Sequence, residues 1–109
     1  MVKQGDIIKL NFDLNAGHEQ AGYRPALVIS NYVFNEKTDL TILCPITNTN
    51  STFPLHIALD ERTKTTGFIL CQHVRALDLE ARGYSFVEQI PDDLLKKVVD
   101  VVYKEIEII

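Results

Sequence analysis

The sequence has few of the residues that build metal centres or disulfide scaffolds. Its two cysteines, Cys44 and Cys71, stand far apart inside apolar runs. No spacing of Cys, His or Asp residues matches a metal site, so we expect no bound metal and any catalysis to be metal-free. We interpret the cysteines as two reduced thiols in the core of a cytoplasmic protein.

Long hydrophobic runs are also missing. No stretch approaches the roughly 20 apolar residues of a membrane helix, and the chain turns polar within its first six residues, unlike a secretory leader. No phosphate-cradling glycine motif occurs, so we expect no nucleotide cofactor. With 46% hydrophobic and 24% charged residues, the 109-residue chain is predicted to form one soluble globular domain over residues 1–109.

The chain lacks the basic excess that usually marks a nucleic-acid-binding surface. Its net charge is −4, but the acid is unevenly spread. Residues 85–109 carry six acids and three lysines, a balance of −3, whereas the other 84 residues carry a balance of −1. Most of the protein is therefore close to neutral and has room for a local cationic site.

Short β-rich runs fill most of the chain. Seven runs are predicted to be strands: residues 6–12, 26–29, 40–46, 55–59, 67–71, 74–77 and 84–87. Residues 6–12 and 55–59 alternate between apolar and polar, as half-buried strands do, while the continuous apolar run 26–29 fits a central strand. Many short strands at close spacing are typical of a small barrel.

The last segment changes to a helical period. Pro91 suits a first helical position, and Asp92 and Asp93 favour the positive end of the helix dipole. Apolar residues then recur every three or four positions: Leu95, Val98, Val102, Ile106 and Ile109. Acids precede bases by four residues in three pairs: Asp92–Lys96, Asp93–Lys97 and Asp100–Lys104. We expect an amphipathic helix that packs on the barrel as scaffold.

The densest polar cluster is residues 17–25, Gly-His-Glu-Gln-Ala-Gly-Tyr-Arg-Pro. It offers the imidazole of His18, the carboxylate of Glu19 and the guanidinium of Arg24 directly before a buried strand. Cleavage of a phosphodiester by its own 2′-OH requires a base, a cation and an acid, and such a trio supplies them. Arg24 suits a phosphate because its planar fork binds two oxygens at once. A solvated hairpin is the alternative interpretation.

Other candidates lie on the predicted strands. Thr47 ends an apolar strand, where its hydroxyl either donates to a phosphate oxygen or bonds its own backbone. A strand period places His73 and Arg75 on one face, away from Gln72, where they either contact RNA or form ordinary surface. We interpret His56, between Leu55 and Ile57, as a plain surface imidazole.

Four blocks of the sequence resemble the MazF/PemK (Kid) toxins. They are Gly5-Asp6-Ile7-Ile8; residues 17–28, which begin Gly-His-Glu-Gln-x-Gly-x-Arg-Pro; Pro45-Ile46-Thr47; and residues 74–83, from Val-Arg-Ala-Leu-Asp to Ala-Arg-Gly. The blocks occur in the family's order from about residue 4 to residue 106. The resemblance implies a mainly β (α+β) fold, an SH3-like small antiparallel barrel of CcdB/PemK type with a C-terminal α-helix, and a homodimer.

The same resemblance implies a function. The chain would be the toxin of a type II toxin–antitoxin system, an endoribonuclease (mRNA interferase) of the cytoplasm with no membrane partner. It would cut single-stranded mRNA at specific sequences without a metal, leaving a 2′,3′-cyclic phosphate and a 5′-OH. A cognate antitoxin would occlude the RNA site, and the toxin would bind operator DNA only as the toxin–antitoxin complex.

Roles carry over by position. Arg24 matches the family's catalytic arginine, Thr47 its catalytic threonine and Glu19 a nearby glutamate of MazF-type members, while His18 matches the RNA-contacting histidine of the PemK type. We expect further RNA contacts from Gln20, Tyr23, Asn48, Phe53, Gln72, His73 and Arg75.

The general base is not fixed by the resemblance. Relatives often have an acidic residue at the position of Gln72, and PemK-type mechanisms use it as the base. An amide cannot accept a proton at neutral pH, so Glu19 or His73 is expected to handle protons here.

Two further functions stay open. The first is a binding toxin on the same barrel, like the gyrase-poisoning CcdB group, but that group uses a C-terminal tryptophan and this chain has none. The second is a degenerate toxin that binds its antitoxin or promoter and no longer cuts RNA, which the glutamine at position 72 keeps possible.

Overall fold

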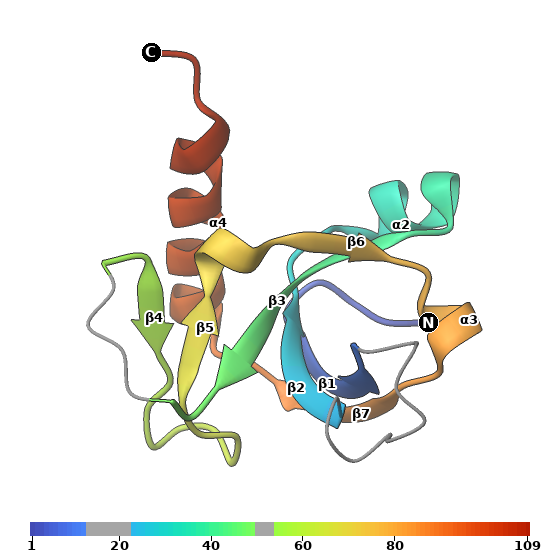
Figure 1. Cartoon of the computed structure of the whole chain (residues 1–109), viewed down its shortest axis with the longest axis horizontal. Coiled ribbons are helices and arrows are strands. Elements are labelled where there is room, and N and C mark those ends of the chain that lie inside the picture. The colour runs from blue at the N-terminus through green and yellow to red at the C-terminus, as the bar shows by residue number, and fades with distance from the viewer. Residues whose placement is uncertain (13–22, 50–53) are drawn as a thin grey trace.

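The computed structural model describes residues 1–12, 23–49 and 54–109. In these residues seven strands form one curved antiparallel sheet (Figure 1). The strands are β1 (Asp6–Asn11), β2 (Tyr23–Val28), β3 (Thr41–Thr47), β4 (His56–Ala58), β5 (Phe68–Leu70), β6 (Arg75–Leu77) and β7 (Ser85–Gln89). The order is β4-β5-β3-β2-β1-β7, and β6 pairs with β3 as well. The predicted fold class is confirmed, although the described strands leave the sheet unclosed at β4 and β7.

Apolar side chains are buried on both faces of this sheet. One core contains Ile7, Leu27, Cys44, Ile46, Ile69 and Val98. The other contains Ile8, Leu10, Ala26, Val28, Leu43 and Leu77. The alternation between the two sets follows the period of two along each strand. The central strand predicted at residues 26–29 is β2, which begins earlier, at Tyr23, and ends at Val28, whereas β1, expected to be half-buried, is covered on both faces at Ile7 and Ile8.

Both cysteines are buried and free, as expected. Burial raises the pKa of the Cys71 thiol to about 11 and raises the pKa of the Cys44 thiol still further. Thiols with raised pKa values stay protonated and unreactive, so both act as small apolar core groups.

The C-terminal helix α4 (Asp92–Ile106) covers the first core. It begins one residue after the predicted start, because Pro91 occupies the N-cap position. Leu94 and Val98 are buried, but Ile106 is 76% exposed, because the end of α4 projects beyond the sheet (Figure 1). The predicted apolar stripe is therefore wrong at its C-terminal end.

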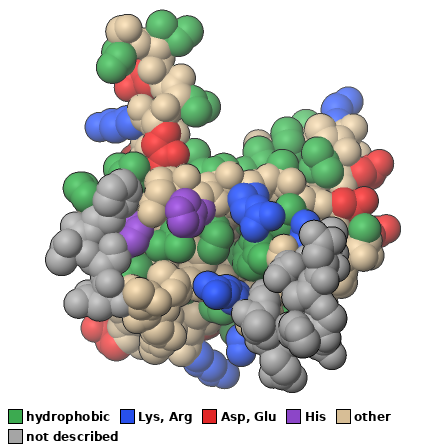
Figure 2. Space-filling model, viewed as in Figure 1, with side chains coloured by type: hydrophobic (Ala, Val, Ile, Leu, Met, Phe, Trp, Pro, Cys, Tyr) green, Lys and Arg blue, Asp and Glu red, His purple; other side chains and the backbone are tan. Residues whose placement is uncertain are grey.

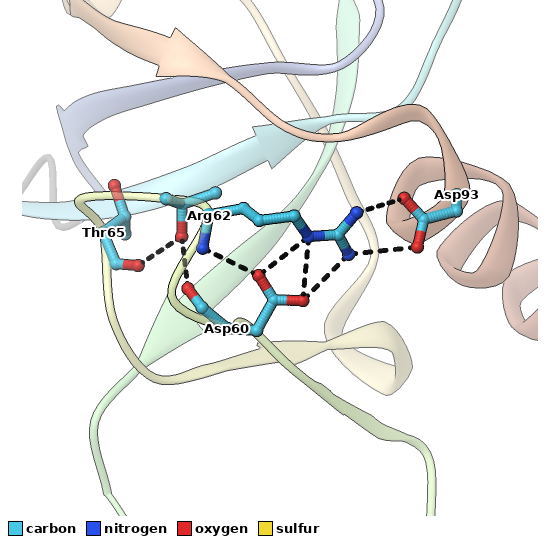
Figure 3. A network of polar contacts seen from close by, with 5 residues as sticks. Asp60, Arg62, Thr65 and Asp93 are labelled. Carbon is cyan, nitrogen blue, oxygen red and sulfur yellow. Dashed lines mark hydrogen bonds and ion pairs between the residues drawn. The ribbon is translucent and has the colours of Figure 1, made fainter.

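The loop between β4 and β5 is tied to α4 and β7. The Arg62 guanidinium contacts Asp60 at 2.8 Å and Asp93 at 2.8 Å (Figure 3). Asp93 therefore pairs with the loop and not with Lys97 as expected. Hydrogen bonds from Arg62 hold the pKa values of the Asp60 and Asp93 carboxyls below their usual range. The network fixes this loop against the start of the helix.

The described residues contain three short helices at places where the sequence shows no periodic signal. They are α2 (Tyr32–Thr38), the 3₁₀ turn η1 (Cys71–His73) and α3 (Leu79–Arg82). Asn31 caps α2 by accepting from Phe34 N at 3.0 Å, and Asp78 caps α3 by accepting from Ala81 N at 3.2 Å. Across the described ranges, no helix is long and apolar enough to span a membrane.

Candidate functional site

Arg24 and Thr47 lie at the ends of two neighbouring strands. β2 and β3 pair Val28 with Leu43 and Ala26 with Pro45, and the same register continued by two residues sets Arg24 opposite Thr47. Opposite residues of an antiparallel pair project to one face, here the face that carries Ala26. Pro25 and Pro45 lack the N–H groups that would extend the ladder. The two polar side chains therefore share the open end of the β2–β3 pair.

Their surroundings differ from those of a buried ion pair. Arg24 is exposed and Thr47 is half-buried. In the part of the chain that the structure describes, no carboxylate lies within ion-pair distance of Arg24. The guanidinium is thus available to an anion from solution, and a hydroxyl lies on the same face.

A tight turn holds Thr47 in place. Thr49 N donates to Thr47 Oγ1 at 3.2 Å, which is the backbone bond expected for a strand-end threonine. A hydroxyl that accepts such a bond can still donate its own hydrogen, so both expectations for Thr47 are compatible. Asn48, expected to contact RNA, is exposed and accepts from Thr66 Oγ1 at 2.9 Å.

Gly67 allows β5 to approach this turn. It has φ +114°, and a Cβ atom there would lie 2.3 Å from the Thr47 carbonyl oxygen. Only glycine fits such a position. Sequence reasoning missed both Gly67 and Thr66 as supports for Thr47, although the Thr65-Thr66-Gly67 turn is a signal for a tight approach of two strands.

Contacts from the far side of the sheet fix the start of β2. The Tyr23 hydroxyl lies 2.9 Å from Ser85 Oγ on β7, and its side chain remains 46% exposed. Arg82 Nη1 donates to the carbonyls of Asn11 and Phe12, at 3.0 Å each. Tyr23 is therefore a fixed, partly exposed aromatic side chain, but it precedes Arg24 on β2 and consecutive strand residues project to opposite faces, so the structure does not put it beside the Arg24 guanidinium. No sequence signal indicated the contacts made by Ser85 and Arg82.

The expected pairing of His73 with Arg75 on one strand face is wrong. His73 belongs to the 3₁₀ turn η1, whereas Arg75 begins β6, so the period of two does not connect them. Both side chains are exposed. The Arg75 guanidinium lies over the Phe12 ring, with 5.2 Å between Cζ and the ring centroid. Arg75 is therefore held at the edge of the site while His73 projects from the turn beside it.

His56 is not the plain surface imidazole that the sequence suggested. It is half-buried on the edge strand β4, and its Nε2 lies 2.8 Å from Nε2 of Gln72. Its ring centroid also lies 6.4 Å from that of Phe68, which pairs with Thr47. Gln72, expected to contact RNA, is half-buried and engaged with His56.

Four predicted site residues lie outside the described residues. They are His18, Glu19, Gln20 and Phe53. The segments that contain them adjoin β2 and the turn after β3, and so border Arg24 and Thr47 in sequence.

Histidine and basic side chains gather on one face of the molecule. Figure 2 shows them between the two grey segments, whereas acidic side chains lie toward the rim and along the C-terminal helix. A cavity of about 410 Å³ lies elsewhere, among α2, α3 and Met1. No group of three or more His, Cys, Asp or Glu residues in the described ranges could hold a metal ion. This face supplies cationic and hydroxyl groups for an anionic ligand.

Comparison with known proteins agrees with this arrangement. A model of the family described as "PemK-like, MazF-like toxin of type II toxin-antitoxin system" matches residues 3–105. The chain belongs to this toxin family. The endoribonuclease PemK of Escherichia coli is 34% identical over 101 residues, which cover 89% of this chain and 76% of that protein.

Two further relatives fit the same assignment. The endoribonuclease toxin MazF of Escherichia coli (strain K12) is 35% identical over 79 residues, covering 72% of this chain and 70% of that protein. The crystal structure of MazE-MazF (Form-III) from Deinococcus radiodurans superposes with a TM-score of 0.84 and 31% identity, covering 95% of this chain and 94% of that chain. The toxin is therefore a member of a family of endoribonucleases.

Proposed function

We propose that this toxin cleaves single-stranded mRNA at specific sequences by a metal-independent attack of the 2′-OH on the adjacent phosphate. The products are a 2′,3′-cyclic phosphate and a 5′-OH. The observation that supports the proposal is the β2–β3 register, whose last observed pair is Ala26 with Pro45 and whose continuation by two residues would put Arg24 opposite Thr47 on one open face. The 109 residues act as one toxin domain of the cytoplasm.

Arg24 and Thr47 stabilise the charge that develops on the phosphate. As the 2′-oxygen attacks, negative charge grows on the non-bridging oxygens of the phosphorane. The Arg24 fork binds two of these oxygens, and the Thr47 hydroxyl donates one more hydrogen bond. Removal of a single donor of this kind typically slows an enzyme by about 10²–10³-fold.

Proton transfer is assigned to groups near these two residues. Glu19 or His73 removes the proton of the 2′-OH or returns one to the leaving 5′-oxygen. His73 is exposed on η1, and Glu19 precedes Arg24 by five residues. If Glu19→Gln and His73→Gln both leave the cleavage rate unchanged, this part of the proposal is wrong.

The partners follow from the relatives. A MazF chain in the similar Deinococcus radiodurans structure is bound to MazE. We infer that this toxin likewise binds a cognate antitoxin, that it forms a homodimer, and that it contacts operator DNA only within the toxin–antitoxin complex. His18, Gln20, Tyr23, Asn48, Phe53, Gln72, His73 and Arg75 contact the RNA.

The nucleophile provides the decisive test. A long single-stranded RNA is incubated with the protein in EDTA, and the cut sites and end groups are mapped. We expect cleavage with cyclic-phosphate and 5′-hydroxyl ends, and no cleavage when the nucleotide 5′ to the cut carries a 2′-deoxy sugar. Intact RNA, or a 2′-deoxy substrate cut at the normal rate, would contradict the mechanism. Arg24→Ala should abolish the cleavage, whereas Lys37→Ala on the exposed face of α2 also removes one positive charge and should retain it.

A further inference from the structure

The His56–Gln72 pair is an unusual feature next to the proposed site. The Gln72 side-chain amide donates to Nε2 of His56 at 2.8 Å. An imidazole nitrogen accepts such a bond when the ring carries its proton on Nδ1. Within the described part of the chain, Oε1 of Gln72 is buried and accepts no hydrogen bond. One end of the amide is therefore fixed, and its acceptor is unsatisfied.

An unsatisfied buried acceptor calls for a physical reason. Such an oxygen has lost its hydrogen bonds to water and has gained none in return, and native structures rarely leave a buried polar group unpaired. The oxygen is also already desolvated. A donor can reach it only when the groups that cover it in the free protein move aside, and it then gains a hydrogen bond without first removing water from the acceptor.

The position of the pair connects it with the cleavage site. His56 pairs with Leu70 across β4 and β5, and Phe68, two residues earlier on the same face of β5, pairs with Thr47. The His56 and Phe68 rings are 6.4 Å apart between centroids. Thr47, Phe68 and His56 thus follow one another across the sheet, and Gln72 lies beyond them. A nucleotide next to the scissile phosphate would reach this end of the row.

We propose that Gln72 recognises an RNA base through Oε1 and that His56 is the positioning residue that holds the amide in this orientation. The ligand group is an exocyclic amino group of a base, because Oε1 only accepts hydrogen bonds. His56 occupies the amide N–H, so the amide keeps its oxygen directed to the base. This inference rests on the proposed ribonuclease function and adds the origin of part of its sequence specificity.

The donor can be removed from the RNA one base at a time. Once the cut site is mapped, short RNAs carry a base without its amino group at single flanking positions. Adenosine is replaced by purine riboside, guanosine by inosine and cytidine by its 4-deamino analogue. At one position we expect the wild-type kcat/KM to fall roughly 10-fold, mainly through KM. Gln72→Met, which has a similar shape and no amide, should be insensitive to the same replacement.

The role of His56 is tested by the hydrogen-bonding character of its replacement. In His56→Glu the carboxylate only accepts, so it should hold the Gln72 amide as the imidazole does and retain the discrimination. In His56→Lys the ammonium only donates, so it should turn the amide round, direct its NH₂ group to the base and abolish the preference for the amino group. His56→Leu should give an intermediate discrimination. A merely structural role predicts the same discrimination in all three variants.

Controls separate the possible outcomes. Ile57 lies on the same strand as His56 but packs against the first core, the one that contains Ile69. Ile57→Val should therefore change stability without changing discrimination. Thermal unfolding checks that each variant is folded. Suppose that the wild-type protein cuts RNA, but that removing an amino group from the RNA lowers its kcat/KM no more than it lowers that of Gln72→Met. The inference is then wrong and the ribonuclease function stands. If wild-type protein cuts no RNA, the proposed function itself fails.

Discussion

Two arginines of this toxin have opposite surroundings. Arg62 lies between Asp60 and Asp93 and donates hydrogen bonds to both carboxylates (Figure 3). Arg24 stands exposed at the open end of β2, and the described residues place no carboxylate within ion-pair distance of it. The same side chain thus serves the scaffold in one place and is left available for a ligand in the other.

The difference shows that the partners of a charged side chain, and not its charge alone, indicate its role. A guanidinium that already binds two carboxylates gains little from a phosphate, because its donors are occupied. One such as Arg24, which has no carboxylate partner among the described residues, is available to bind an anion. Motif and residue type alone do not separate the two cases, since both arginines lie in polar loops or at their edges.

The largest effect is expected when Arg24 is given the kind of partner that Arg62 has. Thr47→Asp puts a carboxylate at the position that the continued β2–β3 register sets opposite Arg24, and it removes the hydroxyl in the same step. Cleavage should fall by more than roughly 100-fold, because the cation is neutralised and a donor is lost. Initial rates on one RNA measure the change. Thr49→Asp adds the same charge to the same exposed turn and should retain most activity; an equal loss in both variants would mean that charge alone matters.

The support of Thr47 by Gly67 can be broken separately. Gly67→Ala places a Cβ atom 2.3 Å from the Thr47 carbonyl oxygen, whereas Gly83→Ala, also at positive φ, meets nothing within 4 Å. Strain of the backbone alone costs of order 1 kcal/mol, so the free energy of unfolding should fall by about 1 kcal/mol in Gly83→Ala and by about 3 kcal/mol in Gly67→Ala. Urea unfolding measures both. Equal losses would show that the strand approach at Thr47 is not tight.

Breaking the Arg62 network should affect stability and not cleavage. In Arg62→Gln the loop loses its ion pairs with Asp60 and Asp93, which are exposed and screened by salt. We expect the melting temperature to fall by a few degrees at low salt and by less in 1 M NaCl. The cleavage rate at a temperature where both proteins are folded should match the wild type. A slower rate without a change in melting temperature would place Arg62 in the site.

The smallest effect concerns the acid stability of the same loop. Burial alone would raise the pKa of Glu88, but hydrogen bonds from Lys64 N, Thr65 N and Thr65 Oγ1 outweigh it and lower this pKa. A lowered pKa gives stability that is complete above the unfolded value of about 4.3 and is lost as pH falls through the folded value. Between pH 5 and pH 3, the free energy of unfolding should therefore depend less steeply on pH in Glu88→Gln than in the wild type. An unchanged slope would contradict this assignment.

The sequence predicted the parts of the fold that depend on local periodicity. Alternation identified β1, and the apolar run 26–29 identified the C-terminal half of β2, because burial and strand period act on neighbouring residues. The helices α2 and α3 were missed, since each is short and held by a single cap and by packing from distant strands. The exposed end of α4 was missed because a helical stripe does not reveal where the sheet stops.

The site, like the fold, could be predicted only where local sequence determines it. Arg24 and Thr47 came from motifs, but their opposition across β2 and β3 depends on a register that residues 24 and 47 do not encode by themselves. His56 was misjudged because its partner, Gln72, lies 16 residues away in sequence. The support from Ser85, Arg82 and Gly67 likewise arises only when distant strands meet.

The direct test of this account compares the two arginines in one assay. Arg24→Ala and Arg62→Ala are incubated with the same single-stranded RNA in EDTA, at a temperature where thermal unfolding shows both to be folded, and initial cleavage rates are measured. We predict that Arg24→Ala loses roughly 100-fold or more of the rate, while Arg62→Ala stays within about twofold of the wild type. Equal rates in the two variants, or cleavage that survives in Arg24→Ala, would contradict the assignment of Arg24 as the phosphate-binding group.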